Sequence, residues 1–128
     1  MKISEASKIA GVSKRTLQYY DDEGLLSVKR MENNHRDYDL ESLQIIWKIL
    51  NLKEMGFELE EIRRLLVQDR ISFDEKKEEI RKKIKDYQIQ YKYIEYIERN
   101  GFPEINKKES YIEQIEKMKK EIDNNIIK

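Results

Sequence analysis

Helix-breaking residues are scarce in this 128-residue chain, which holds four glycines and one proline. They stand at Gly11, Gly24, Gly56, Gly101 and Pro103. Glycine and proline are the main local interruptions of regular structure, and the segments between them are rich in the helix formers Glu, Lys, Ile and Leu. The sequence therefore predicts a mainly α-helical fold in which each glycine ends a helix.

Composition excludes several function classes. The chain has no cysteine and a single histidine, His35, so we expect no metal site, no thiol chemistry and no cofactor. It has no Gly-rich phosphate loop and no nucleophile–base pair, which argues against an enzyme. No apolar run approaches the ~20 residues of a membrane span, and no secretory signal follows Met1, so we expect a cytoplasmic protein without a membrane partner.

The first 26 residues show two short helical patterns separated by a turn at Gly11. Ser4 is a candidate N-cap of the first helix, and Ser13 is a candidate N-cap of the second. Leu17 and Tyr20 share the inward face of the second helix, whereas basic and hydrogen-bonding side chains face outward. This pattern predicts a helix-turn-helix with the second helix as the reading helix. The net charge is zero, so any nucleic-acid contact depends on this local patch.

Residues 27–38 are polar and lack helical periodicity. Asn33 and Asn34 tolerate the positive φ of a tight turn, so this segment is predicted to be a short hairpin, or wing, with Lys29, Arg30 and Arg36 on it.

Two further helices are expected before residue 70. Asp39 is the N-cap of the first, which has a wide apolar surface that needs cover from two sides. Gly56 ends this helix, and a shorter one follows it. The apolar positions are Leu40, Leu43, Ile46, Trp47 and Leu50, with Ile45, Ile49 and Leu52 as a second stripe, and then Leu59, Ile62, Leu65 and Leu66.

Residues 73–100 form one uninterrupted helical pattern that begins at a Ser72 capping box and ends at Gly101. Apolar residues recur with coiled-coil spacing. A helix this polar buries too little by itself, so we expect a homodimer, parallel or antiparallel. The predicted dimerisation residues are Phe73, Ile80, Ile84, Tyr87, Tyr91 and Ile94.

A last helix is predicted after Ser110, with Tyr111, Ile115, Met118 and Ile122 on one apolar stripe and Ile112 and Ile126 beside it. This stripe is expected to dock on Ile89, Tyr93 and Tyr96 of the long helix. Because the tyrosines recur at helical spacing, our first interpretation is that they are core residues. A second interpretation is a pocket for a small-molecule effector, planar, apolar or cationic, lined by Tyr93, Tyr96 and Tyr111.

Residues 1–66 resemble the DNA-binding domain of the MerR family of bacterial transcription regulators. The motifs that carry the resemblance are Ile3-Ser4-Glu5-Ala6-Ser7, Gly11-Val12-Ser13, Arg15-Thr16-Leu17-Gln18-Tyr19-Tyr20-Asp21, Gly24-Leu25-Leu26, Arg36-Asp37-Tyr38 and Met55-Gly56-Phe57-Glu58-Leu59-Glu60-Glu61-Ile62. The long helix is similar to the family's antiparallel dimerisation helix in position and length.

The resemblance implies a winged helix-turn-helix domain at 1–72, a dimerisation helix at 73–100 and a short C-terminal helical segment at 101–128. It implies a homodimer that binds double-stranded promoter DNA and distorts the spacer between promoter elements, and so acts on RNA polymerase indirectly. The implied DNA-contacting residues are Lys14, Arg15, Thr16, Gln18 and Tyr19 on the reading helix, with Arg36 and Tyr38 in and beside the wing.

The chain departs from the family pattern at three places. Gln18 stands where the family usually has Arg. Gln prefers adenine and Arg prefers guanine, so the preferred base is expected to differ. Asn33-Asn34-His35 replaces an Asn-Gly-Tyr wing tip, and Glu58 replaces a serine cap. Two alternatives stay open: an architectural, excisionase-like DNA-binding protein, and a coiled-coil interaction module that does not bind DNA.

Overall fold

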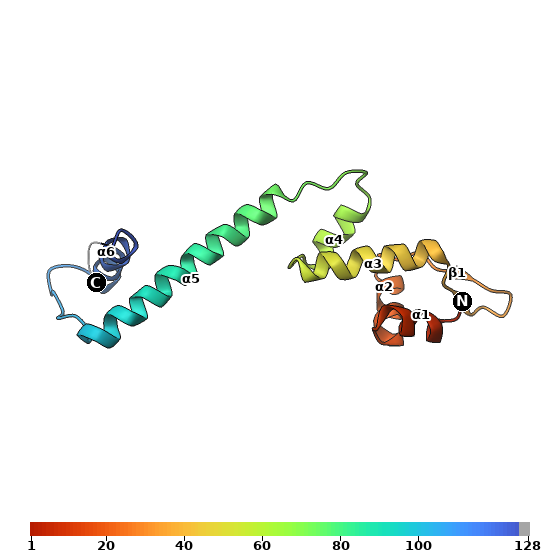
Figure 1. The fold of residues 1–128 in the computed structure, drawn as a ribbon, viewed down its shortest axis with the longest axis horizontal. Helices are drawn as coiled ribbons and strands as arrows, with labels where there is room; N and C mark the ends of the chain where they lie inside the picture. Colours follow the sequence, from red (N-terminus) through yellow and green to blue (C-terminus); the bar gives the residue numbers. More distant parts are fainter. Residues whose placement is uncertain (126–128) are drawn as a thin grey trace. The chain divides into compact units, whose positions relative to one another are not determined.

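The computed structural model describes residues 1–125. The chain consists of two compact units, of which the first ends at Ile71 and the second begins at Ser72. Figure 1 shows the course of the chain. Each unit is mainly helical, as predicted. Ile126, which was expected to flank the last apolar stripe, lies outside the described residues.

The first unit contains four helices and a two-stranded hairpin. Their bounds are α1 Ile3–Ala10, α2 Lys14–Asp22, β1 Lys29–Arg30, β2 Arg36–Asp37, α3 Leu40–Glu54 and α4 Leu59–Leu66. The helix-turn-helix is α1 and α2, and the turn between them contains Gly11 with φ 72°. The positive φ explains glycine at this position, because side chains with a Cβ rarely adopt it.

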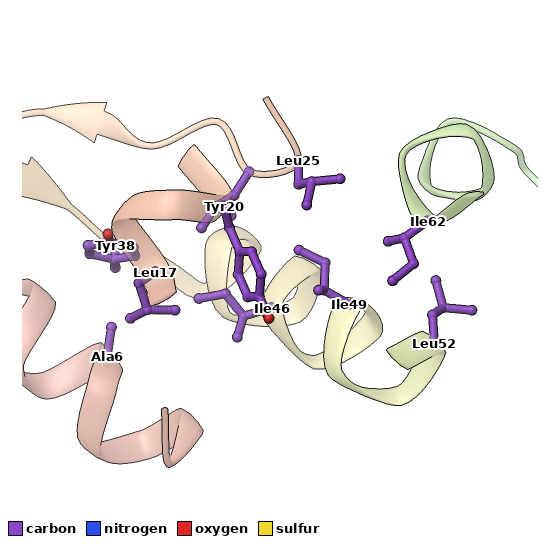
Figure 2. Packing of buried hydrophobic residues seen from close by; sticks show 10 residues of the cluster. Ala6, Leu17, Tyr20, Leu25, Tyr38, Ile46, Ile49, Leu52 and Ile62 are labelled. Carbon is purple, nitrogen blue, oxygen red and sulfur yellow. The ribbon is translucent and has the colours of Figure 1, made fainter. Parts of the chain in front are cut away.

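One hydrophobic cluster holds this unit together (Figure 2). It contains Ala6, Leu17, Tyr20, Leu25, Leu26, Tyr38, Ile46, Ile49, Leu52 and Ile62. Helix α3 contacts both α1 and α4, so the two-sided cover expected for α3 is confirmed. The inward face of α2, Leu17 and Tyr20, is also confirmed as core.

Two apolar residues of α3 are not covered within the first unit. Leu40 is 71% exposed and Trp47 is 69% exposed. They are seven residues apart and therefore share one side of the helix. The prediction that they belong to the buried stripe is wrong, because α1 and α4 cover the face centred on Ile46 and Ile49.

Side-chain caps start two helices of this unit as predicted. The Ser13 Oγ accepts a hydrogen bond from the Thr16 N–H at 3.1 Å, and the Asp39 Oδ1 accepts one from the Ser42 N–H at 2.9 Å. Ser4, by contrast, is not a cap, because α1 already begins at Ile3 and Lys2 takes the N-cap position.

The predicted wing is confirmed as an antiparallel hairpin in which Lys29 pairs with Asp37 and Arg30 with Arg36. Its turn is closed by the Met31 N–H, which donates to the His35 carbonyl at 2.8 Å. Asn34 has φ 66°, the left-handed conformation that asparagine tolerates better than most residues.

The second unit consists of α5 Asp74–Asn100 and α6 Tyr111–Asp123. Helix α5 has Phe73 at its N-cap, so the predicted Ser72 cap is one residue too early. Helix α6 packs on α5 as predicted at Ile122, which is buried, and at Met118, whose sulfur accepts from the Tyr93 hydroxyl at 3.8 Å. The predicted stripe is covered only in part, because Tyr111 is 63% exposed and Ile115 is 40% exposed. Within residues 1–125, the helices are all too short or too polar to cross a membrane.

Candidate nucleic-acid interface

The outward face of α2 is the first component of the candidate site. Leu17 and Tyr20 anchor the helix in the core, and this turns the opposite side to solvent. Four of the predicted DNA-contacting residues are exposed on α2: Lys14, Arg15, Gln18 and Tyr19. This face presents two cations, an amide and a phenol in a little over one helical turn, which suits contacts to both phosphates and base edges.

Thr16, the fifth predicted residue on this helix, is half-buried. Its Oγ1 lies 2.9 Å from the Ser13 Oγ, and its backbone N–H donates to the same Ser13 oxygen. Thr16 therefore belongs to the N-terminal cap of α2, where it fixes the start of the reading helix.

A concave surface joins α2 to the start of α1 and to the wing. Its volume is about 290 Å³, and four of its lining side chains are cationic: Lys2, Lys14, Arg30 and Arg36. Gln18 and His35 also line it. Cations from three separate elements converge here although the chain as a whole is neutral, so this surface has the local charge that a DNA backbone requires.

Arg36 connects the wing to the reading helix. Its Nε donates to the Asp21 Oδ2 at 2.8 Å, and its Nη2 donates to the Asp22 Oδ1 at 3.4 Å. The hydrogen bond to Asp21 raises the pKa of Arg36, although partial burial works in the opposite direction. Only part of the guanidinium is thus available to DNA, and the ion pair fixes the wing against the C-terminal end of α2.

Tyr38 requires a correction. The expectation was that its side chain contacts DNA, but the structure buries it completely, with 0% exposure. The segment after β2 turns inward, and the Tyr38 N–H and carbonyl both bond to Met1, the N–H to the Met1 carbonyl at 2.8 Å. Burial raises the pKa of the Tyr38 hydroxyl. Tyr38 therefore packs beneath the wing as part of the core.

Asp21 was not recognised as a site residue from the sequence. It also lies 4.0 Å from the Arg30 Nη2, so it faces both arginines of the wing. A signal was present, because an acidic pair closes the reading helix just before a basic hairpin. The pairing was not deducible, because it depends on how the hairpin folds back onto α2.

In the second unit, the residues predicted to form a dimer seam lie exposed along α5 and just before it. Exposure ranges from 37% for Phe73 to 67% for Tyr87 and Tyr91, with Ile80, Ile84 and Ile94 between them. Helix α6 contacts α5 through Tyr93, which is on the other side of the helix from the seam. Helix α6 approaches the seam only at Ile94, which lines a groove together with Ile115 and Lys119 of α6. Tyr87 and Tyr91 stay largely exposed.

The candidate effector residues are only partly brought together. Tyr93 and Tyr111 line one cavity between α5 and α6. Tyr96 is not among the residues that line this cavity, although it is half-buried on α5.

A helix-turn-helix with an exposed polar and basic second helix, flanked by a two-stranded wing, defines the winged helix-turn-helix class. The family model of the MerR HTH family of regulatory proteins matches residues 1–69, which is more than half of the chain. The chain belongs to this family.

Relatives found by sequence and relatives found by structure are both consistent with this family. The nodulation protein NolA of Bradyrhizobium sp. is 44% identical over 66 residues, which are 51% of this chain and 28% of NolA. The chain therefore spans less than a third of that relative. MtaN is the N-terminus of the multidrug transporter activator of Bacillus subtilis, and its crystal structure is known. It is 30% identical to this chain with a TM-score of 0.67, and the match covers 80% of this chain and 99% of MtaN.

A third relative was solved with DNA. HiNmlR, a MerR family regulator that lacks the sensor domain, was crystallised bound to promoter DNA. It is 27% identical with a TM-score of 0.53, over 74% of this chain and 84% of HiNmlR.

Proposed function

We propose that this protein is a sequence-specific DNA-binding transcription regulator that binds promoter DNA as a homodimer. The single observation that carries the proposal is the exposed face of α2, with Lys14, Arg15, Gln18 and Tyr19, next to a wing held in place by Arg36. Membership of a family of regulatory proteins supports a regulator rather than an enzyme.

Three of the exposed residues of α2, together with Arg36, have separate proposed roles. Lys14 and Arg15 bind phosphates through their positive charge, or guanine edges through hydrogen bonds in the major groove. Gln18 reads a base edge, and its amide matches the donor–acceptor pair of adenine in the major groove. Arg36 contributes the part of its guanidinium that Asp21 and Asp22 leave available.

The homodimer is proposed to form through α5, with residues 73–100 as the dimerisation helix. The seam places four exposed aromatic or aliphatic side chains in the middle of the helix, Ile84, Tyr87, Tyr91 and Ile94. A stripe of this kind on a long, otherwise charged helix is usually covered by a partner. The resemblance to MerR dimerisation helices favours an antiparallel pair.

A dimer with two reading helices would bind a pseudo-palindromic site. By family resemblance, it would distort the spacer between the promoter elements and so act on RNA polymerase indirectly. Residues 1–72 would be the reading domain and 101–128 an accessory helical segment. The excisionase-like and coiled-coil alternatives explain only one unit each, whereas this proposal uses both.

DNA binding is tested by gel shift on the region upstream of the protein's own gene, with scrambled DNA of equal length as the competitor. Arg15→Ala should weaken binding at least about tenfold, because a charge-assisted contact contributes roughly 1.5–3 kcal/mol. Lys120→Ala is the control, because it removes the same charge from an exposed position on α6. Equal affinities of both variants and the wild type would refute the assignment of α2 as the reading helix.

Dimerisation is tested by sedimentation equilibrium of a variant with Tyr87→Asp and Tyr91→Asp. Two carboxylates in the seam of each chain would face each other in an apolar contact, so the variant should be monomeric. The control is Lys82→Asp, which makes the same change of two charge units at an exposed position on the side of α5 opposite the seam. A seam variant that dimerises as tightly as this control would show that the register is wrong.

A further inference from the structure

The second unit contains a cavity that DNA binding does not explain. Its volume is about 530 Å³, within the range of roughly 300–1,000 Å³ common for small-molecule sites. Three segments form its walls, each with aromatic or aliphatic side chains: Tyr93 and Ile97 from α5, Phe102 and Ile105 from the connecting loop, and Tyr111 and Ile115 from α6.

The part of the loop that follows the cavity wall, residues 106–109, is held to α6 by hydrogen bonds. The Gln114 Nε2 donates to the Asn106 carbonyl at 2.7 Å and to the Glu109 carbonyl at 3.0 Å. The Gln114 Oε1 accepts from the Asn106 N–H at 3.0 Å. Lys117 adds an ion pair to Glu109. These bonds attach the loop to α6 directly after residues 102–105, and this limits how far the loop side of the cavity can move from α6.

The charge of the lining is one-sided. Among the described residues that line the cavity, Glu104 is the only carboxylate, and none is a lysine, arginine or histidine. This is unusual in a chain with 26 Lys and Arg residues in 128. The amide of Gln114 is occupied by the loop, so Glu104 supplies the charge that can select a ligand, beside the hydroxyl groups of the lining tyrosines.

The aromatic side chains add to this selectivity. Tyr93, Phe102 and Tyr111 come from the three walls, and the negative faces of aromatic rings attract cations. Phe102 is 88% exposed and Tyr111 is 63% exposed. When a flat apolar molecule covers large aromatic surfaces that were exposed to water, the free energy falls.

We propose that the cavity between α5, α6 and residues 102–105 binds a small planar aromatic cation, with its ring system against the tyrosines and its charge toward Glu104. The absence of cysteine and the lining itself argue against a metal ion as the ligand. The proposal concerns binding in the second unit and does not depend on the proposed DNA binding.

The experiment uses two fluorescent probes of similar shape, proflavine, which is a cation near neutral pH, and acridone, which is neutral. Each is titrated with the full chain in the absence of DNA, and binding is followed by fluorescence anisotropy. The wild type should bind proflavine more tightly than acridone. Glu104→Gln should weaken proflavine binding about two- to fivefold, as for a partly exposed ion pair, and leave acridone unchanged.

Two further variants complete the test. Tyr111→Ala should weaken the binding of both probes, because it removes an aromatic side chain from the cavity wall. Glu116→Gln changes the same charge on α6 outside the lining and should change neither, and circular dichroism verifies that each variant is folded. The proposal is overturned if proflavine binds all variants equally or if Glu104→Gln and Glu116→Gln have the same effect. It is also overturned if neither probe binds up to millimolar concentration, the result expected when a second copy of the chain covers the cavity.

Discussion

Arg36 in the wing is bound to Asp21 at the C-terminal end of the reading helix, with its Nε 2.8 Å from the Asp21 Oδ2. Both side chains are only 18% exposed. The contact joins two elements separated by 15 positions in the chain, and it determines where the wing stands relative to α2. The position of the wing is therefore a property of this ion pair as well as of the hairpin.

Asp21→Asn should weaken DNA binding on all sequences, by several-fold, measured by fluorescence anisotropy on operator and random DNA. Loss of the charged hydrogen bond frees the wing and Arg36, and a freed side chain must be ordered again on binding. Simple electrostatics predicts the opposite, because the substitution removes a negative charge close to the DNA.

Asp22→Asn is the matched control for this prediction. The Asp22 carboxylate is 69% exposed and lies 3.4 Å from the Arg36 Nη2, so its removal should change affinity little. Tighter binding by Asp21→Asn would show that Asp21 acts by repulsion and not by positioning the wing.

Gln18→Ala should relax base preference at one base pair in each half-site while leaving affinity for random DNA almost unchanged. A bidentate amide contact to adenine contributes about 1–3 kcal/mol of discrimination. The measurement is competition binding against operators that carry each base at each position. A uniform loss of affinity on all DNA would place Gln18 among the phosphate contacts instead.

Ile122→Ala should loosen α6, because Ile122 is 3% exposed and is the buried contact of this helix with α5. Hydrogen exchange of the amides in residues 111–123 should accelerate by at least about tenfold, since truncation of a buried Ile commonly costs about 2–5 kcal/mol. Ile112→Ala is the control, because Ile112 is 69% exposed on the same helix. Equal exchange in the two variants would mean that α6 is not held through Ile122.

Stability at acid pH should depend on Asp39, the N-cap of α3. The Ser42 N–H bond holds the pKa of Asp39 below its ordinary value, with the Ser42 hydroxyl and Lys29 acting in the same direction. A lowered pKa in the folded state stabilises the fold above the ordinary pKa of Asp, and this contribution disappears as pH falls through the lowered value.

The comparison of wild type with Asp39→Asn isolates this effect, because an Asn side chain can still accept the Ser42 bond but does not titrate. The advantage of the wild type in urea unfolding should be constant near neutral pH and shrink below about pH 4. An advantage that persists unchanged to about pH 2.5 would contradict the role assigned to the Asp39 charge.

Local chemistry in the sequence determined most of the secondary structure. The four glycines and the caps at Ser13 and Asp39 act within a few residues of themselves, so their effect is readable from neighbours in the chain. The same holds for Ser110, whose Oγ accepts from the Glu113 N–H at 3.1 Å and caps α6. The apolar spacing of α2 and α6 likewise identified which side of each helix packs. The outward residues of α2 followed directly, because they are the complement of Leu17 and Tyr20.

Tertiary structure decided which apolar faces are covered and which charges are paired. Periodicity marks a face of a helix as apolar but does not name its neighbour, so Trp47 was expected in the core and is exposed, whereas Tyr38 was expected at the surface and is buried. The bond between Asp21 and Arg36 and the cavity beside Glu104 have the same origin. Each depends on segments that are distant in sequence, and their proximity is set by packing of the whole unit.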